Sequence, residues 1–219
     1  MRSMKGLTGL KFISISLLPA VVLTIAFLVL SPASASAAEW NPLPDTGQEK
    51  CYDNSGEIPC PQPGEPFYGQ DAQYNGPEPT YQDNGDGTVT DLNTGFMWQQ
   101  ATADTNNDGT ITYNDGTIPY EDVLTWQEAM DYCDTLTFAD HSDWRLPAKF
   151  ELQSIVDYGR FSPAINPVFS CPWSGHYWSA TPYVVVHDSA WSVIFSSGKE
   201  NFHSNIFAHL YVRCVRGGL

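Results

Sequence analysis

Twelve residues near the middle of the chain have the spacing of a calcium-binding loop: DTNNDGTITYND, residues 104–115. Calcium takes about six to eight oxygen ligands, and alternate side chains of a tightly turning loop can point at one ion. Gly109 would permit the sharp turn, and Ile111 would anchor the loop on the core. The spacing predicts calcium as a cofactor, with these ligands: Asp104, Asn106, Asp108, Thr110 through its carbonyl, and Asp115. The alternative is a surface loop that binds no metal.

A second acidic loop, DNGDG at residues 83–87, has no full series of ligands. Asp86-Gly87 is instead typical of a tight turn, because both positions tolerate a positive φ. We therefore expect a hairpin over residues 80–100, with a core strand at Phe96–Trp98.

The residues that could support catalysis are few. The five histidines lack zinc-site spacing, and no G-x-S-x-G motif or phosphate-binding loop is present. Cys171 precedes His176 by five residues and could imitate a Cys–His pair, but free cysteines are commonly buried and inert. We expect no enzyme. Two alternatives stay open: an extracytoplasmic enzyme that uses Cys171 or a metal at the acidic loops, and a structural envelope component.

Aromatic and short polar residues gather in the turns between the late strands, over residues 171–188 and 199–207. Flat apolar faces bury area on a ligand, and short polar groups set its orientation. The candidate ligand-binding residues are Trp173, His176, Tyr183, His187, Asp188, Asn201, His203 and Asn205. The alternative is that the aromatic members belong to the core and the others are ordinary loop residues.

Two helices and three late strands would position these residues. Thr125 and Glu128 form a capping-box pattern, which predicts a helix over residues 125–137. Pro147 suits the first turn of a second helix that ends at Gly159. Enrichment in β-branched and aromatic residues predicts strands at 177–181, 190–195 and 210–215. Strands, two helices and strands again indicate an α+β fold with antiparallel pairing.

The block DWRLP, residues 143–147, joins the two predicted helices. Trp144 and Leu146 can enter the core while Arg145 stays partly exposed. We expect Arg145 to form a structural ion pair with one of three nearby carboxylates: Asp140, Asp143 or Glu151.

Charge narrows the range of partners. The chain carries 25 Asp and Glu against 10 Lys and Arg, a net charge of −15. This balance argues against nucleic acid and anionic lipid and favours cations. It also disfavours sulfated ligands, because three late basic residues at most could form a small positive spot: Lys199, Arg213 and Arg216.

Residues 1–37 have the order of a secretory signal: a basic start, an apolar run over 12–30, and small residues that suit cleavage after Ala35 or Ala37. An uncleaved anchor is the alternative and would be the route to a membrane. Export predicts a secreted, periplasmic or cell-surface protein in which disulfides are the default. Residues 38–79 are expected to form an irregular Pro/Gly-rich arm, closed locally by a Cys51–Cys60 disulfide.

The blocks TWQEAMDYC, DWRLPAKFELQSIVDY, HYWSAT and YVRCVRGG, with DNGDGTVTDLNTGFMWQ upstream, follow the order of one family. Over about residues 80–217 the chain resembles the Lcl C-terminal domain of a bacterial collagen-like surface adhesin. One departure is Ala148, where the family often has Ser or Thr, and we expect its loss to weaken the helix start.

This resemblance implies a C-type-lectin-like domain over residues 80–219. Such folds often tie the first helix to the last strand by a disulfide, and Cys133 and Cys214 match those places. The resemblance implies an exported binding module for an extracellular glycan or protein ligand, stabilised by calcium and disulfides, with oligomers possible. Cys171 matches no regular cysteine of the family and could bridge two chains.

Overall fold

The computed structural model describes residues 44–74, 76–107, 109–111, 122–171, 175–204 and 208–218, and residues 40–219 form one compact unit. The predicted signal over residues 1–37 lies outside the described residues. So do four of the candidate site residues: Asp108, Asp115, Trp173 and Asn205.

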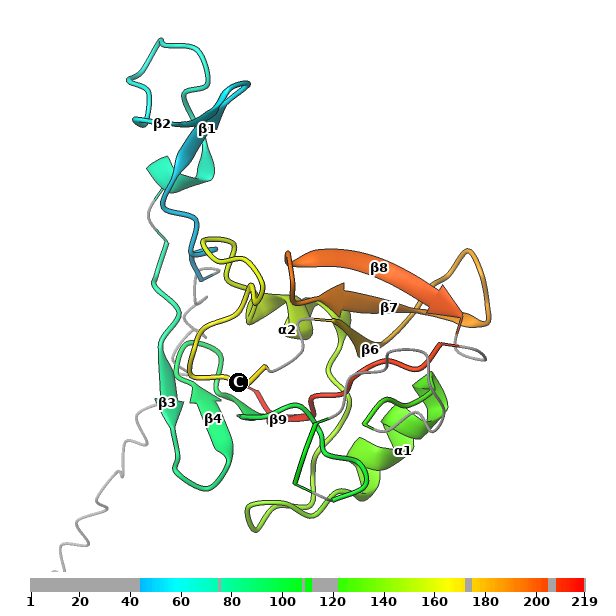
Figure 1. Cartoon of the computed structure of the whole chain (residues 1–219). Coiled ribbons are helices and arrows are strands. Elements are labelled where there is room, and N and C mark those ends of the chain that lie inside the picture. The colour runs from blue at the N-terminus through cyan, green and yellow to red at the C-terminus, as the bar shows by residue number, and fades with distance from the viewer. Residues whose placement is uncertain are drawn as a thin grey trace, which may run out of the picture. The chain divides into compact units, whose positions relative to one another are not determined.

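One antiparallel sheet joins the two ends of the domain (Figure 1). Its order is β3 (Tyr81–Asp83), β4 (Thr88–Asp91), β5 (Phe96–Gln99) and β9 (Val215–Gly217). The predicted hairpin is confirmed, but its turn is longer than a two-residue Asp-Gly turn. Asp83 pairs with Val89, and Gly85 and Gly87 take the positive φ values.

A second antiparallel sheet has the order β6 (His176–Pro182), β7 (Ser189–Ile194) and β8 (Lys199–Ser204). The prediction that 199–207 is a loop was wrong over 199–204, because pairing with β7 holds a segment without β-branched residues as a strand. The strand expected over 210–215 is also wrong in its bounds. Leu210 and Tyr211 form isolated bridges, and β9 begins at Val215.

The described residues contain two α-helices beside the antiparallel sheets, so the mixed α+β class is confirmed. Helix α1 (Trp126–Thr135) starts with the expected capping box between Thr125 and Glu128. Helix α2 (Lys149–Ser154) stops before the predicted end at Gly159. The chain turns there to pair Val156 with Ile165, and that pairing competes with further helical hydrogen bonds.

The two helices pack on opposite faces of the β6–β7–β8 sheet. Alternation along the strands puts Tyr177 and Val193 on one face, in a buried cluster with Leu152 of α2. Trp178 and Ala190 lie on the other face, clustered with buried residues of α1. The middle strand of this sheet is therefore buried on both sides.

Both expected disulfides are present. Cys133 of α1 bonds to Cys214 with a Cα–Cα distance of 5.6 Å, and Cys51 bonds to Cys60 with 5.1 Å. Trp144 and Leu146 are buried as predicted, and the guanidinium of Arg145 donates to both carboxylate oxygens of Glu151 at 2.6 and 2.8 Å.

The arm is more regular than expected. It contains a hairpin of β1 (Cys51–Asp53) and β2 (Gly56–Ile58), and a short 3₁₀ helix, η1 (Asp71–Gln73). The carboxylate of Asp53 accepts hydrogen bonds from the backbone of Ser55 and Gly56, which closes the turn.

Candidate ligand-binding site

The candidate ligand-binding residues separate into two groups. On β8, Asn201 and His203 lie on the α1 side of the sheet, since Asn201 pairs with Ser192 opposite Trp178. Phe202 pairs with Trp191 and faces the α2 side. The expected single face therefore does not form, because neighbouring residues of a strand point to opposite sides.

Stacked aromatic rings mark the α2 side. Tyr183 stacks on Phe202 with ring centroids 4.2 Å apart and an interplanar angle of 14°. Trp191 meets both rings edge-on, at 5.1 Å from Tyr183 and 6.3 Å from Phe202. This geometry is favourable for aromatic rings and fixes their positions.

Three consecutive valines continue this cluster into the β6–β7 loop. Val184, Val185 and Val186 are 81%, 70% and 41% exposed, and Phe202 is 44% exposed. We call these four residues together with Tyr183 and Trp191 the apolar tip. His187 and Asp188 are exposed at the end of the same loop.

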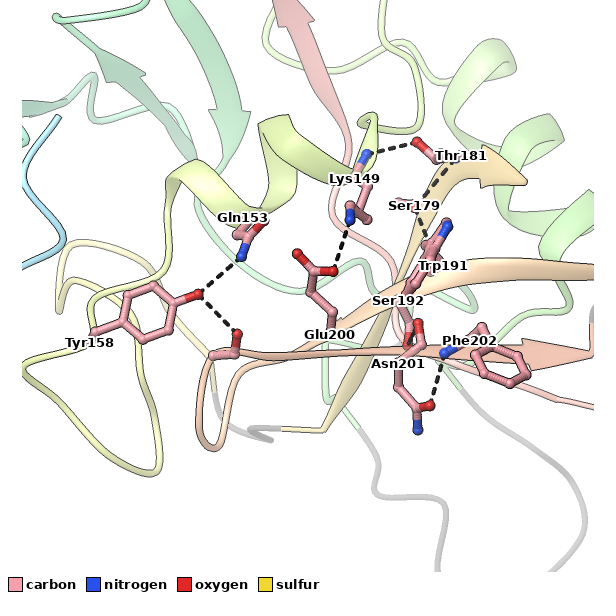
Figure 2. A network of polar contacts seen from close by, with 11 residues as sticks. Lys149, Gln153, Tyr158, Ser179, Thr181, Trp191, Ser192, Glu200, Asn201 and Phe202 are labelled. Carbon is pink, nitrogen blue, oxygen red and sulfur yellow. Dashed lines mark hydrogen bonds and ion pairs between the residues drawn. The ribbon is translucent and has the colours of Figure 1, made fainter. Parts of the chain in front are cut away.

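Lys149 ties α2 to this side of the sheet (Figure 2). Its ammonium donates to the carboxylate of Glu200 on β8 at 2.8 Å, and it lies 4.5 Å from the Trp191 ring centroid. The side chains of Lys149 and Glu200 are only 14% and 27% exposed. The aromatic cluster is thus held by a helix as well as by its own strands.

A histidine pair occupies the α1 side. Nε2 of His203 lies 2.9 Å from Nδ1 of His176, with the rings perpendicular and their centroids 4.5 Å apart. Burial, and to a smaller extent the neighbouring His203, lower the pKa of His176 to about 4. Burial also lowers the pKa of His203. Both imidazoles are neutral at neutral pH.

Asn201 lies on strand β8 and not in a loop, and its side chain bonds to the backbone. Its Oδ1 accepts a hydrogen bond from the backbone N–H of Phe202 at 2.9 Å. Because β8 is the outer strand of its sheet, this bond covers one donor that another chain could otherwise pair with.

Two of the three late basic residues that could have formed a positive spot have other partners. Arg213 is fully buried and donates to the backbone carbonyls of Gln99, Gln100 and Ser170 at 2.7, 2.5 and 2.8 Å. Arg216 pairs with Asp143 at 2.6 Å. A buried guanidinium needs several acceptors, and these three carbonyls supply them.

Cys171 and His176 contact different residues. The thiol of Cys171 lies 3.4 Å from the hydroxyl of Tyr177, whereas His176 contacts His203. The buried Tyr177 hydroxyl also meets Thr102 Oγ1 at 2.5 Å. Desolvation raises the pKa of Tyr177 well above its usual value.

The described part of the predicted calcium loop has the expected turn. Gly109 has a φ of +83°, and its N–H donates to Oδ2 of Asp104 at 2.8 Å. Ile111 packs against the buried core, as expected for an anchor. Of the predicted calcium ligands, the structure describes Asp104, Asn106 and Thr110. Within the described residues, no three or more His, Cys, Asp or Glu side chains gather in a group that could hold a metal ion.

A cavity of about 360 Å³, lined by both polar and apolar side chains, opens beside this loop. Asp104 and Asn107 line it on the loop side, Tyr132 on α1, and Gln99 at the end of β5. Desolvation raises the pKa of Tyr132. Amide, carboxylate and phenol groups in one concave site are suited to hydroxyl-rich ligands.

Sequence reasoning missed most of the apolar tip. The run Val184–Val186 was available as a signal, but three consecutive valines equally suit a buried strand. Phe202 lies within the range 199–207 that was expected to bind a ligand, but it was not among the named candidates. The contact of Lys149 with Trp191 joins segments 42 positions apart and has no local pattern.

In comparisons with known proteins, the model of the Lcl C-terminal domain matches residues 87–216, more than half of the chain. No curated protein matches the chain. Within the described residues, no helix combines the length and apolar character needed to cross a membrane.

Proposed function

The chain belongs to the family of the Lcl C-terminal domain, and we propose that it is an exported, surface-exposed binding module whose apolar tip binds a protein partner. The predicted signal segment and the adhesin domain that the chain resembles support export and display at the cell surface. The order of the elements supports a lectin-like arrangement of the domain. Its disulfides, and calcium at the loop of residues 104–115, would stabilise it outside the cell.

The observation that carries the proposal is the exposure of Val184 and Val185 beside the stacked rings of Tyr183 and Phe202. Single exposed apolar residues are normal, but contiguous apolar surface usually marks an interaction site. The rings and Lys149 fix the base of the tip, so less entropy is lost when a partner binds.

A protein partner fits this surface better than a glycan. Valine side chains offer no hydrogen bonds to sugar hydroxyls, whereas they pack well against apolar protein side chains. The acidic net charge of the chain favours partners with a basic rim around an apolar centre.

A glycan is the second candidate, and the cavity beside residues 104–107 favours it, because polar groups and aromatic rings line it together. Tyr132 and Asn107 line that cavity, about 360 Å³ in volume, and could orient a sugar ring. The two candidates place the ligand on different surfaces.

The test measures binding of the labelled chain to cell envelopes of the bacterium that produces it. Val185→Asp should weaken binding at least tenfold, while Leu92→Asp serves as a matched control at an exposed apolar residue in the turn that follows β4. Protease treatment of the envelopes should abolish binding if the partner is a protein. Binding that survives protease, is lost after periodate and tolerates Val185→Asp would favour the glycan.

The proposal gives the chain no catalytic role. Titration of Cys171 with and without denaturant distinguishes it from the enzyme alternative, since a fast-reacting thiol in the folded chain would favour catalysis. Non-reducing electrophoresis would detect the intermolecular bridge that a structural component could form.

A further inference from the structure

His176 and His203 are held in place by pairing that does not depend on their side chains. Both β6 and β8 pair with β7, which is the middle strand of the sheet. The ring of Trp178 lies 6.1 Å from that of His203, edge to face. Strand pairing and this aromatic contact fix two imidazoles whose backbones are far apart in the sequence.

The separation of the two ring nitrogens suits a shared metal ion. Bonds from a metal to imidazole nitrogen are about 2.0–2.1 Å long, so two such nitrogens lie about 2.9 Å apart at a right angle and about 3.3 Å apart at a tetrahedral angle. The observed distance from His203 Nε2 to His176 Nδ1 is 2.9 Å, and in this hydrogen bond one ring nitrogen donates to the other. A metal ion would take the place of the shared proton, and the rings would rotate so that both lone pairs turn toward the ion.

The chemistry of the surroundings favours a metal that prefers nitrogen. No carboxylate forms an ion pair with either imidazole within the described residues. Calcium and magnesium prefer oxygen ligands, whereas imidazole suits copper, nickel and zinc. A right-angled pair of nitrogens is compatible with the square-planar geometry that copper(II) and nickel(II) adopt.

We propose that His176 and His203 form a two-histidine site for a divalent transition metal, with copper(II) bound more tightly than zinc(II). Water completes the coordination sphere. The site lies on the α1 side of the sheet, opposite Trp191 and Phe202 of the apolar tip, and it uses none of the predicted calcium ligands. It does not depend on the proposed partner binding. The order of affinity follows the general preference of nitrogen sites for copper(II).

The test titrates the purified full chain with Cu²⁺ in excess Ca²⁺, so that oxygen sites are already filled. Binding is followed by the visible absorption and by the nitrogen splitting in the electron paramagnetic resonance spectrum. We expect one equivalent of Cu²⁺ with two imidazole nitrogens. His176→Gln and His203→Gln should each weaken binding at least tenfold, whereas the controls His187→Gln and His209→Gln should bind as the wild type does.

A second measurement needs no variant. Bound Cu²⁺ or Zn²⁺ should protect His176 and His203 of the wild-type chain from diethyl pyrocarbonate, while His187 remains reactive. The proposal is overturned if His176→Gln and His203→Gln bind Cu²⁺ like the wild type. It is also overturned if the metal leaves the reactivity of this pair unchanged.

Discussion

The hydroxyl of Thr181 on β6 accepts a hydrogen bond from the backbone N–H of Lys149 at 2.9 Å, at the first turn of α2 (Figure 2). Ala148 at the N-cap has no side-chain oxygen for this purpose. A neighbouring strand therefore supplies the hydroxyl that the helix itself lacks. Glu151 completes the start of the helix by accepting from the backbone N–H of Ala148 at 2.8 Å.

We predict that Thr181→Val lowers the free energy of unfolding by about 1 kcal/mol, the usual value of an N-cap hydrogen bond. Ala148→Ser should restore most of this loss in the Thr181→Val background, because serine can cap the helix from its own position. Urea unfolding measures both effects. Thr137→Val, at an exposed threonine, is the control. Equal effects of Thr181→Val and Thr137→Val would contradict the role of Thr181.

The two disulfides should differ in their contribution to stability. Cys133 and Cys214 are 81 positions apart, whereas Cys51 and Cys60 are 9 apart, and a longer closed loop restricts the unfolded chain more. Replacing the Cys133–Cys214 pair by alanines should cost roughly 2–5 kcal/mol. Replacing Cys51–Cys60 should cost less. Peptide mapping that links Cys171 to any of the four would refute both pairings.

Calcium should raise the melting temperature if residues 104–115 bind it. Extracellular loops of this type bind with a dissociation constant on the order of 10⁻⁴–10⁻³ M, so millimolar calcium is required. Asp108→Ala should abolish the rise, whereas Asp134→Ala, with the same loss of charge on α1, should not. Melting curves that coincide with and without chelator would exclude the site.

Stability should fall between about pH 6.5 and pH 4 because of the histidine pair. The pKa of His176 is about 4 in the folded chain and 6.5 ordinarily, so the unfolded chain takes up the proton first. Stability is therefore full above the ordinary pKa and is lost as the pH falls toward the folded value. Because the rings are half-exposed, we expect a loss of about 1 kcal/mol after solvent screening.

Unfolding measured in the presence of chelator should show this loss in the wild type and less of it in His176→Gln. The variant His187→Gln should behave as the wild type does. Carboxylates with lowered pKa values, such as Glu151, lose their stabilising charge only at lower pH. A pH profile of His176→Gln that matches the wild type over this window would contradict the prediction.

Residues of the apolar tip should affect partner binding independently of the histidines. Tyr183→Ala removes the ring that stacks on Phe202 and should cost about 2 kcal/mol of binding free energy if the ring is an energetic anchor. His203→Ala should leave binding of the partner unchanged, because His203 lies on the opposite side of the sheet. Surface plasmon resonance with the captured partner measures the affinity of both variants. Equal affinities of Tyr183→Ala and His203→Ala would contradict the prediction.

Local patterns predicted the local parts of the fold. The capping box of α1 and the hairpin of β3 and β4 depend on residues a few positions apart, and both are present. The end of α2 could not be predicted, because Val156 leaves the helix to pair with Ile165. Strand β8 could not be predicted either, because its stability comes from pairing with β7 rather than from its own composition.

Some residues of the candidate site were named from the sequence, but their separation onto two sides of the sheet was not predicted. His176 and His203 were both candidates, and the structure brings their nitrogens together. Tyr183 was a candidate too, but the alternation along β8 separates it from the histidines. Successive residues of a strand place their side chains on opposite sides of the sheet. Because residues 199–204 were assigned to a loop, this alternation could not be predicted.

Arg213 and Cys214 are neighbours in the sequence, yet together they fix three distant segments. Arg213 holds the carbonyls of Gln99, Gln100 and Ser170, and Cys214 is bonded to α1. A chain that emerges with its amino end first can form its hairpins and helices early, but it cannot lock them before residue 214 appears. In the export that we propose, the segments held by Arg213 and Cys214 would therefore be locked together only after residue 214 has followed them.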